Sequence, residues 1–302
     1  MSFNNNASKG LIYSSNMKNR TGRYVKTLLV GFTCLFLAAA SGCGQAKVNK
    51  AVSSTASHSS SENSSSIVSS SSSSAASSEA QASSAGNTAR RVICIDPGHQ
   101  AKVDLSEEAI APNSNVMKTK NPGGTEGVVT KLPEYKLNLE VALKLEQQLK
   151  SLGYQVVMTR DNNDGDISNI GRAQVANNCN ADMFVRIHAD GVDQQSANGI
   201  SVLYPGGQYI SDTALLTQSK KVAQDLLDGM VASTGAKNRN LSERSDMTGF
   251  NWCTRPMALI EMGFMSNPDE DQKMSTDAYQ NELVTGMVNG INKYFYDKDH
   301  GN

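Results

Sequence analysis

The stretch Ala258-Leu-Ile-Glu-Met-Gly-Phe-Met-Ser-Asn267 decides the fold. An apolar run reaches the carboxylate Glu261 and then breaks at Gly263 into a polar turn. Short apolar runs bounded by turn residues are typical of buried strands. In open α/β sheets, ligands collect beyond the carboxyl ends of the strands. The sequence therefore predicts that Glu261 lies at a functional edge of a sheet.

Two histidines follow apolar runs in the same way. One run is Val92-Ile-Cys-Ile-Asp-Pro-Gly-His99, and the other is Met183-Phe-Val-Arg-Ile-His188. The carboxyl ends of parallel strands meet at one edge of a sheet. We therefore expect His99, His188 and Glu261 to lie close together, although they are far apart in the sequence.

The apolar runs alternate with amphipathic segments across residues 89–298. This alternation predicts a single α/β domain with a central, mostly parallel sheet of about six strands and helices on both faces. Residues 100–132 are polar and contain glycine, so they predict a long loop that could cover the site as a lid. The expected strands are 91–95, 154–159, 183–188, 199–204 and 256–262, and the expected helices are one opened by Pro133, 170–177, 212–233 and one over 279–295.

Residues 1–42 resemble the signal peptide of a bacterial lipoprotein. Five basic residues and no acidic residue precede Cys43, and the apolar run 27–40 is short for a transmembrane helix. Ala40-Ser-Gly-Cys43 is similar to a lipobox, in which the signal is cleaved before a cysteine that carries a lipid. We expect a lipid on Cys43 that anchors the protein to the outer face of the bacterial cytoplasmic membrane. The alternative is an ordinary secretory signal.

Residues 43–88 predict a disordered tether. The segment is rich in Ser and Ala and contains no Phe, Trp or Tyr. Such a composition buries too little apolar area to offset the entropy lost on ordering. A flexible coil of about 45 residues has a root-mean-square span of roughly 35–40 Å. This length suits a membrane-anchored protein that reaches into a surrounding layer.

The part of the chain from Arg90 onward is mildly acidic. Seven of the 28 Lys and Arg residues and two of the 29 Asp and Glu residues precede Arg90, which leaves 21 basic and 27 acidic residues and a charge near −6. Proteins that bind nucleic acid through phosphate contacts are typically basic. The charge therefore argues against a nucleic-acid partner.

The polar groups at the predicted edge suit a metal. Two imidazoles and one carboxylate are a common ligand set for catalytic Zn²⁺, and a second carboxylate can act as a general base. The chain has four histidines, and the two in the predicted domain both fall at this edge. Alternatives remain at this point: each histidine could be a hydrogen-bonded structural residue, and Glu261 could pair with Arg255. The carboxylate ligand could be Glu126, Glu134 or Glu140.

Four motifs then resemble the zinc-dependent N-acetylmuramoyl-L-alanine amidases of the Amidase_3 type. They are Asp96-Pro-Gly-His99, Glu134-Tyr-Lys-Leu-Asn138-Leu, Arg186-Ile-His188-Ala-Asp190 and Ile260-Glu-Met-Gly-Phe-Met-Ser-Asn267, and the resemblance covers residues 91–297. It implies that His99, Glu134 and His188 bind Zn²⁺ and that Glu261 is the catalytic carboxylate. It also selects Glu134, because the family's ligand precedes an Asn by four residues, as Glu134 precedes Asn138.

The chain departs from the family's usual residues at three positions. The family often has Gly where Gln100 stands, Asn where Asp190 stands and Gly where Asn240 stands. These departures remove neither a ligand nor the base, so they bear on substrate fit. Arg239 is a candidate substrate contact, with a plain surface arginine as the alternative.

The resemblance implies hydrolysis of the amide bond between N-acetylmuramic acid and L-alanine in peptidoglycan. One alternative is a peptidoglycan-binding lipoprotein whose zinc site is inactive or activated by a partner protein. Another is a zinc peptidase that cuts within the stem peptide. The presence of Glu261 favours an enzyme, because a protein that only binds the wall has no evident need for it.

Overall fold

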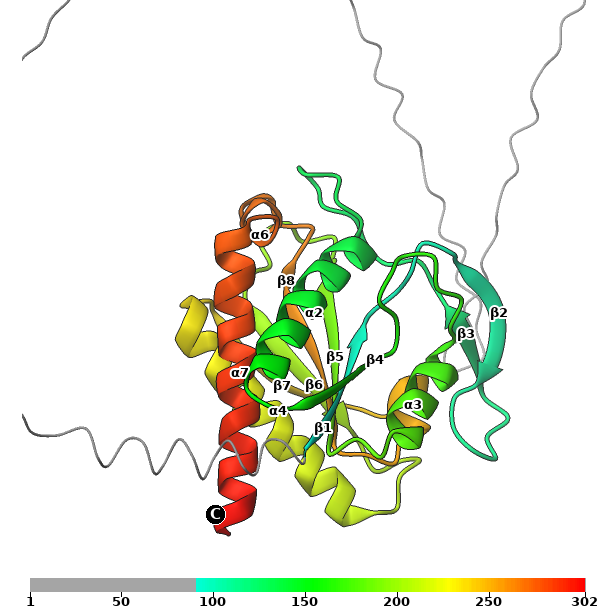
Figure 1. Ribbon diagram of the computed structural model, residues 1–302. Coiled ribbons are helices and arrows are strands. Elements are labelled where there is room, and N and C mark those ends of the chain that lie inside the picture. Colours follow the sequence, from blue (N-terminus) through cyan, green and yellow to red (C-terminus); the bar gives the residue numbers. More distant parts are fainter. Residues whose placement is uncertain (1–90, 302) are drawn as a thin grey trace, which may run out of the picture. The chain divides into compact units, whose positions relative to one another are not determined.

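The computed structural model describes residues 91–301, and these form the folded domain (Figure 1). The predicted signal peptide, the tether and Cys43 lie outside the described residues. Within residues 91–301, no helix has the length and apolar character needed to cross a membrane.

A six-stranded sheet forms the centre of the domain, in the order β4-β1-β5-β8-β6-β7. The first four strands in this order run parallel, β6 is antiparallel to β8, and β7 is parallel to β6. The mostly parallel α/β fold predicted from the sequence is confirmed. The strands are β1 (Val92–Pro97), β4 (Gln155–Met158), β5 (Met183–Asp190), β6 (Ile200–Pro205), β7 (Asn238–Arg244) and β8 (Met257–Phe264).

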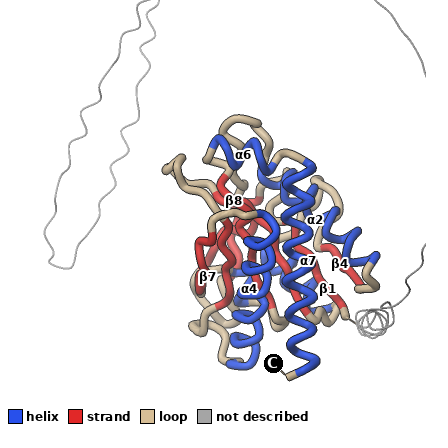
Figure 2. The backbone as a smooth tube through the Cα atoms, turned by 90° about the vertical axis from the view of Figure 1, so that its left-hand side faces the viewer, coloured by secondary structure: helices blue, strands red, loops and turns tan. Residues whose placement is uncertain are grey.

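Three long helices cover one face of the sheet (Figure 2). They are α2 (Glu134–Ser151), which Pro133 precedes as N-cap, α4 (Thr213–Thr234) and α7 (Asp277–His300). Their apolar sides bury the larger core of the domain against the sheet. Helices α4 and α7 approach closely, because a Cβ at Gly286 would lie 2.5 Å from the Cα of Met230.

The other face has a thinner cover. Helix α3 (Asn169–Asn178) and the four-residue helix α5 (Thr248–Asn251) pack there over a smaller apolar cluster that includes Phe184 and Phe250. A further short helix, α6 (Pro268–Met274), follows β8.

The strand register brings the polar residues of the sheet to this thinly covered face. Successive side chains of a strand point to opposite faces, so residues two apart share a face. Arg186 and His188 therefore lie on the same face as Phe184. Asp96 is the register partner of Arg186, and Glu261 is the register partner of His188. The polar residues thus form successive rows toward the carboxyl ends of β5 and β8.

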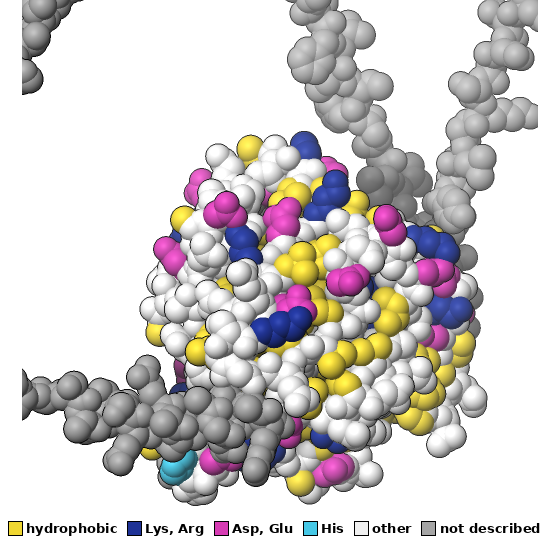
Figure 3. Space-filling model, viewed as in Figure 1, with side chains coloured by type: hydrophobic (Ala, Val, Ile, Leu, Met, Phe, Trp, Pro, Cys, Tyr) yellow, Lys and Arg dark blue, Asp and Glu magenta, His cyan; other side chains and the backbone are white. Residues whose placement is uncertain are grey.

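The segment expected as a long loop contains a β-hairpin, so that expectation is wrong over part of residues 100–132. Strands β2 (Asp104–Ala109) and β3 (Met117–Asn121) pair in a separate antiparallel sheet. The side chains of Asn251 and Trp252 donate hydrogen bonds to the carbonyls of Ile110 and Ala109, at 3.1 and 2.8 Å. Charged side chains of both signs are interleaved over the hairpin in Figure 3. The polar composition hid these strands, and a lid role for the segment stays a prediction.

Candidate active site

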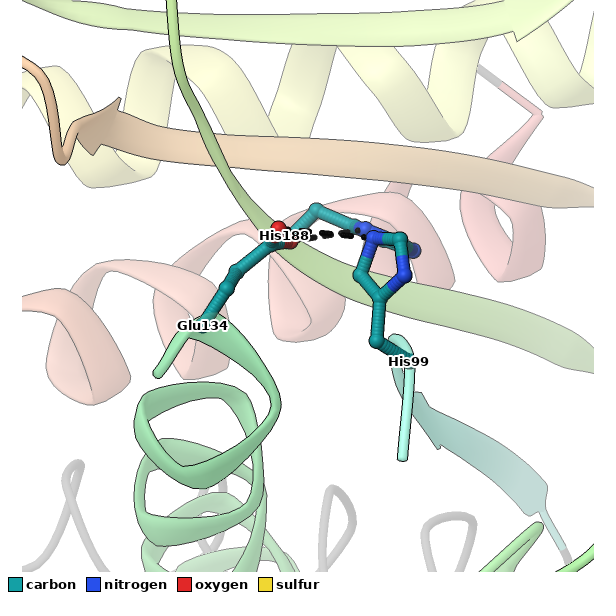
Figure 4. A group of neighbouring side chains, drawn as sticks. All are labelled: His99, Glu134 and His188. Carbon is teal, nitrogen blue, oxygen red and sulfur yellow. Dashed lines mark hydrogen bonds and ion pairs between the residues drawn. The ribbon is translucent and has the colours of Figure 1, made fainter. Parts of the chain in front are cut away.

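Three predicted ligands converge at the carboxyl end of the sheet (Figure 4). His99 follows β1, Glu134 begins α2, and His188 lies near the end of β5. The two oxygens of Glu134 lie 3.1 Å from Nδ1 of His188 and 3.4 Å from Nε2 of His99. One potential ligand atom from each of the three residues lies within 4.8 Å of the others. The elements therefore bring together residues that are up to 89 positions apart in the sequence.

Hydrogen bonds with neighbouring residues orient His99 and Glu134. Nδ1 of His99 lies 2.9 Å from the carbonyl oxygen of Pro122, which leaves Nε2 directed at Glu134. The backbone N–H of Thr125 donates to Glu134 Oε2 at 2.9 Å, and the Asn138 amide donates to Oε1 at 3.1 Å. Such outer hydrogen bonds fix the direction of metal-ligating side chains.

His188 has one nitrogen without a partner. Its Nε2 is buried, and no described residue forms a hydrogen bond with it. A buried polar atom of this kind is rare in folded proteins and costs free energy unless something binds it. The chemistry of the three donors and this orphaned nitrogen both fit a bound metal ion.

The ionisation of the site also suits a cation. Burial opposes the charged form of Glu134, but the hydrogen bond from His188 and the nearby imidazoles together lower its pKa to about 2. Burial lowers the pKa of His188 to about 4, despite the opposing effect of Glu134. At neutral pH, Glu134 is therefore ionised and His188 is neutral. These are the forms that ligate a divalent metal.

Close backbone approach is needed around His99. A Cβ at Gly98 would overlap the His188 ring, and a Cβ at Gly124 would lie 2.6 Å from Oε2 of Glu134. His99 itself has a φ of 56°, in the left-handed region that non-glycine residues seldom occupy. The Pro-Gly-His turn is thus a backbone conformation that the surrounding structure must hold in place.

Two buried arginines hold this turn. Arg160 donates from Nε to the carbonyl of Pro97 and from Nη2 to that of Gly98, both at 2.9 Å. Arg172 donates from Nη1 to the Pro97 carbonyl at 2.8 Å and from Nη2 to the His99 carbonyl at 3.0 Å. Three successive carbonyls are therefore fixed by guanidinium groups directly behind the first histidine.

A buried carboxylate in turn holds the arginines. Asp96 is fully buried and accepts from Arg172 Nη1 at 2.6 Å and from Arg186 Nε at 2.7 Å. Burial alone would raise the pKa of Asp96, but the two guanidinium groups hold it well below its usual range. Asp96 is therefore ionised. It binds Arg172, which holds the turn around His99, and Arg186, which lies two residues before His188 on β5.

Glu261 lies beside this group, on the neighbouring strand. It is the register partner of His188, and its Oε2 is buried with no described hydrogen-bond partner. Burial raises the pKa of Glu261 well above its ordinary value, and the charges of Glu134 and Asp190 add to this effect. A buried carboxyl with a raised pKa is suited to take up and release a proton near neutral pH.

The structure places the competing glutamates away from the histidines. Glu126 pairs with Pro133 through an isolated backbone bridge, and Glu140 accepts a hydrogen bond from Gln280 at 3.2 Å. Of the three candidates, Glu134 is the one brought to the histidines. Whether it ligates a metal stays a prediction.

The two arginines considered from the sequence have other contacts. Arg255 donates to the carbonyls of Ala181 and Asn180, so the proposed pairing with Glu261 is wrong. Arg239 lies 4.7 Å above the Phe264 ring. Its contact with a substrate stays a prediction.

Sequence reasoning missed the arginines behind His99 and the role of Gln100. The side-chain oxygen of Gln100 accepts from Arg172 Nη2 at 2.9 Å and from the Ile167 N–H at 3.2 Å. The departure from glycine at this position therefore adds a structural hydrogen bond. Asn240, the other departure from glycine, has a φ of 68°, which Asn tolerates better than most residues. A charged residue inside an apolar segment, such as Arg186 in β5, was the available signal for a buried ion pair.

Residues 93–293 match the Amidase_3 family, described as N-acetylmuramoyl-L-alanine amidase. The chain belongs to this family. It is 26% identical over 224 residues to the germination-specific N-acetylmuramoyl-L-alanine amidase of Bacillus subtilis, covering 69% of this chain and 81% of that protein. It is 27% identical over 223 residues to the amidase Rv3717 of Mycobacterium tuberculosis, covering 70% of this chain and 88% of that protein.

The fold is similar to that of a solved amidase. The crystal structure of the N-acetylmuramyl-L-alanine amidase Ami1 from Mycobacterium smegmatis matches with a TM-score of 0.63 and 26% identity, and the match covers 70% of this chain and 99% of that one. The resemblance inferred from four motifs is confirmed at the level of family and fold. Family and relatives together support a peptidoglycan amidase function, with action outside the cytoplasm.

The buried ion group beneath this amidase site gives a stability prediction. Asp96→Asn leaves the Arg172 and Arg186 side chains buried without their counterion. Loss of one partner of a buried ion pair typically costs about 3–5 kcal/mol, so we expect the free energy of unfolding in urea to fall by about this amount. Because folding lowers the pKa of Asp96, its contribution is present above about pH 4 and is lost as the pH falls. The difference in the free energy of unfolding between wild type and Asp96→Asn should therefore become smaller as the pH falls below about 4.

Glu146→Gln is the matched control. It removes the partner of Lys150 in a partly exposed ion pair. Such a pair typically contributes less than about 1 kcal/mol to the free energy of unfolding. An Asp96 variant no less stable than this control at pH 7 would contradict the role given to Asp96.

Proposed function

We propose that the protein is a zinc-dependent amidase that hydrolyses the bond between N-acetylmuramic acid and L-alanine in peptidoglycan. One observation carries the proposal: the partly buried group of His99, Glu134 and His188 has a second carboxyl, Glu261, on the adjacent strand. Membership of the amidase family supports the choice of bond.

The donor set fits Zn²⁺. Two imidazoles and one carboxylate are typical ligands of catalytic zinc, and the buried Nε2 of His188 has no other described partner. His99, Glu134 and His188 would hold the ion. When bound, zinc would supply a Lewis acid for the scissile carbonyl and lower the pKa of a water molecule.

Glu261 carries the proton transfers in this proposal. Its carboxylate accepts a proton from the attacking water as the bond from that oxygen to the carbonyl carbon forms. The protonated carboxyl then gives this proton to the L-alanine nitrogen as the carbon–nitrogen bond breaks. The products are a muramic acid carboxylate and a stem peptide with a free amino terminus. The raised pKa of Glu261 suits both halves of this exchange.

We also propose where the reaction takes place. The predicted lipid on Cys43 and the predicted tether over residues 43–88 would hold the catalytic domain, residues 89–298, at the outer face of the cytoplasmic membrane. The cell wall lies within reach of such a tether. A protein activator remains part of the proposal as a possible partner, as in the solved complex of the CwlD amidase with the GerS lipoprotein.

Two variants separate metal binding from turnover. Glu261→Gln should retain zinc at wild-type stoichiometry and lose about 10²–10⁴-fold in the rate of peptide release, since it removes the general base. His188→Ala should lose both zinc and turnover, because it removes a ligand. Zinc is measured in the purified proteins by a chromogenic chelator, and turnover from new amino termini released from purified peptidoglycan.

Glu282→Gln, at an exposed position of α7, is the control and should behave as wild type. Wild-type turnover in the Glu261 variant would exclude it as the base. Full zinc content in the His188 variant would exclude His188 as a ligand.

The lipid is tested on the full chain in a bacterial host. Wild type should incorporate an alkyne-labelled fatty acid and sediment with membranes, whereas Cys43→Ser should lose the label and leave the membrane fraction. Label retained by the variant, or absent from wild type, would refute lipidation at Cys43.

A further inference from the structure

A cavity of about 380 Å³ lies on the thinly covered face of the sheet. Residues of β3, the end of β7 and the start of α5 form its wall. Neither α3 nor the short α5 fills the space between the hairpin and the sheet, which is why a hollow persists there. A second cavity, of about 340 Å³, lies between Glu146 of α2 and the end of β4, away from the hairpin.

The cavity adjoins the candidate active site. Pro122 lines it and also meets Nδ1 of His99 at 2.9 Å through its carbonyl oxygen. Arg186 lines it and lies two residues before His188 on the same face of β5. Arg244 lines it and is close enough to Glu261 to favour the charged form of that carboxyl. A substrate whose scissile bond reaches Glu261 would therefore extend into this cavity.

The wall carries an excess of positive charge. Asp246 accepts two hydrogen bonds from Arg244, at 2.7 and 2.8 Å, and lies 3.7 Å from Nζ of Lys118. The hydrogen bonds from Arg244 lower the pKa of Asp246 to about 2, so one carboxylate faces two cations. Arg186 shares the carboxylate of Asp96 with Arg172, so these three residues together keep one net positive charge. Among the charged side chains that line the cavity, Lys118, Arg186 and Arg244 outnumber Glu107 and Asp246 by one. The remaining carboxylate of the wall, Glu107, is exposed on β2.

Both cations have donors to spare. Arg244 uses Nε and Nη2 for Asp246, and no described residue accepts a hydrogen bond from its Nη1. At 3.7 Å from Asp246, Nζ of Lys118 is beyond hydrogen-bond distance and has no described hydrogen-bond partner. The cavity wall thus has one unmatched positive charge and free hydrogen-bond donors on both Arg244 and Lys118. This arrangement is complementary to one carboxylate.

The wall suits a peptide better than a glycan. None of the described residues that line the cavity is aromatic, so it offers no ring on which a sugar could stack. Its apolar part comes from Met117, Met247 and Pro122, which can pack against short side chains. Of the two sides of the scissile amide, the peptide side carries free carboxylates.

We propose that this cavity binds the stem peptide and that Arg244 and Lys118 recognise the free α-carboxylate of its second residue, isoglutamate. The inference rests on the proposed amidase function and adds a substrate preference to it. Stem peptides with isoglutamate are good substrates, and those in which the carboxylate is amidated to isoglutamine are poor ones.

The test compares two synthetic substrates, N-acetylmuramoyl-L-alanyl-D-isoglutamate and its D-isoglutamine counterpart. Wild-type enzyme should favour the free acid by about ten- to a hundredfold in kcat/KM, the range expected for hydrogen bonds to a charged group. In Arg244→Gln the ratio of the two kcat/KM values should fall close to one, mainly through a higher KM for the acid. In Lys118→Gln the same ratio should fall to a value between one and that of wild type. Lys220→Gln, an exposed lysine on α4, should leave the ratio unchanged.

The substrate ratio separates recognition from effects on the base. Loss of Arg244 also alters the surroundings of Glu261, but that change affects both substrates alike and cancels in the ratio. A wild-type ratio near one, or a ratio that Arg244→Gln and Lys118→Gln both leave intact, would overturn the subsite. Failure of wild type to cleave either substrate or peptidoglycan would instead overturn the proposed function.

Discussion

The buried ion group of Asp96, Arg172 and Arg186 is the interaction on which the site depends. Ionised Asp96 fixes two guanidinium groups that could not otherwise be buried at low cost. Arg172 then holds the carbonyls around His99, which is in a left-handed conformation, while Arg186 lies on β5 two residues before His188. The group thus ties the turn that carries His99 to β5, the strand that carries His188. This explains why Asp96 belongs to the motif that includes His99.

The two faces of the sheet are covered unequally, and this explains why one face holds the main apolar core and the other holds the polar residues of the site. Helices α2, α4 and α7 bury a large apolar core on one face and supply most of the apolar packing. The other face has a small apolar cluster, then the ion group, then the row of His188 and Glu261. Strand alternation keeps these polar rows out of the main core. The cavity beside the site exists because that second face is only partly covered.

The sequence predicted the parallel strands, the long helices and the convergence of His99, His188 and Glu261, because apolar periodicity and strand polarity are local signals with geometric consequences. Family resemblance selected Glu134, which spacing alone could not. The hairpin of β2 and β3 was not predictable from apolar alternation, since its strands are polar. The edge strand β7 is largely exposed and was hidden for the same reason. The supports from Arg160, Arg172 and Gln100 depend on tertiary contacts between segments more than 60 residues apart.

The most direct test of the account is the chemical identity of the bond that is cut. Purified peptidoglycan is incubated with the zinc-loaded protein, and the soluble products are identified by mass spectrometry against a chelated control. The account predicts intact stem peptides that begin with a free L-alanine amino terminus and are absent from the control. Fragments cut between residues of the stem peptide, with L-alanine still attached to muramic acid, would contradict it.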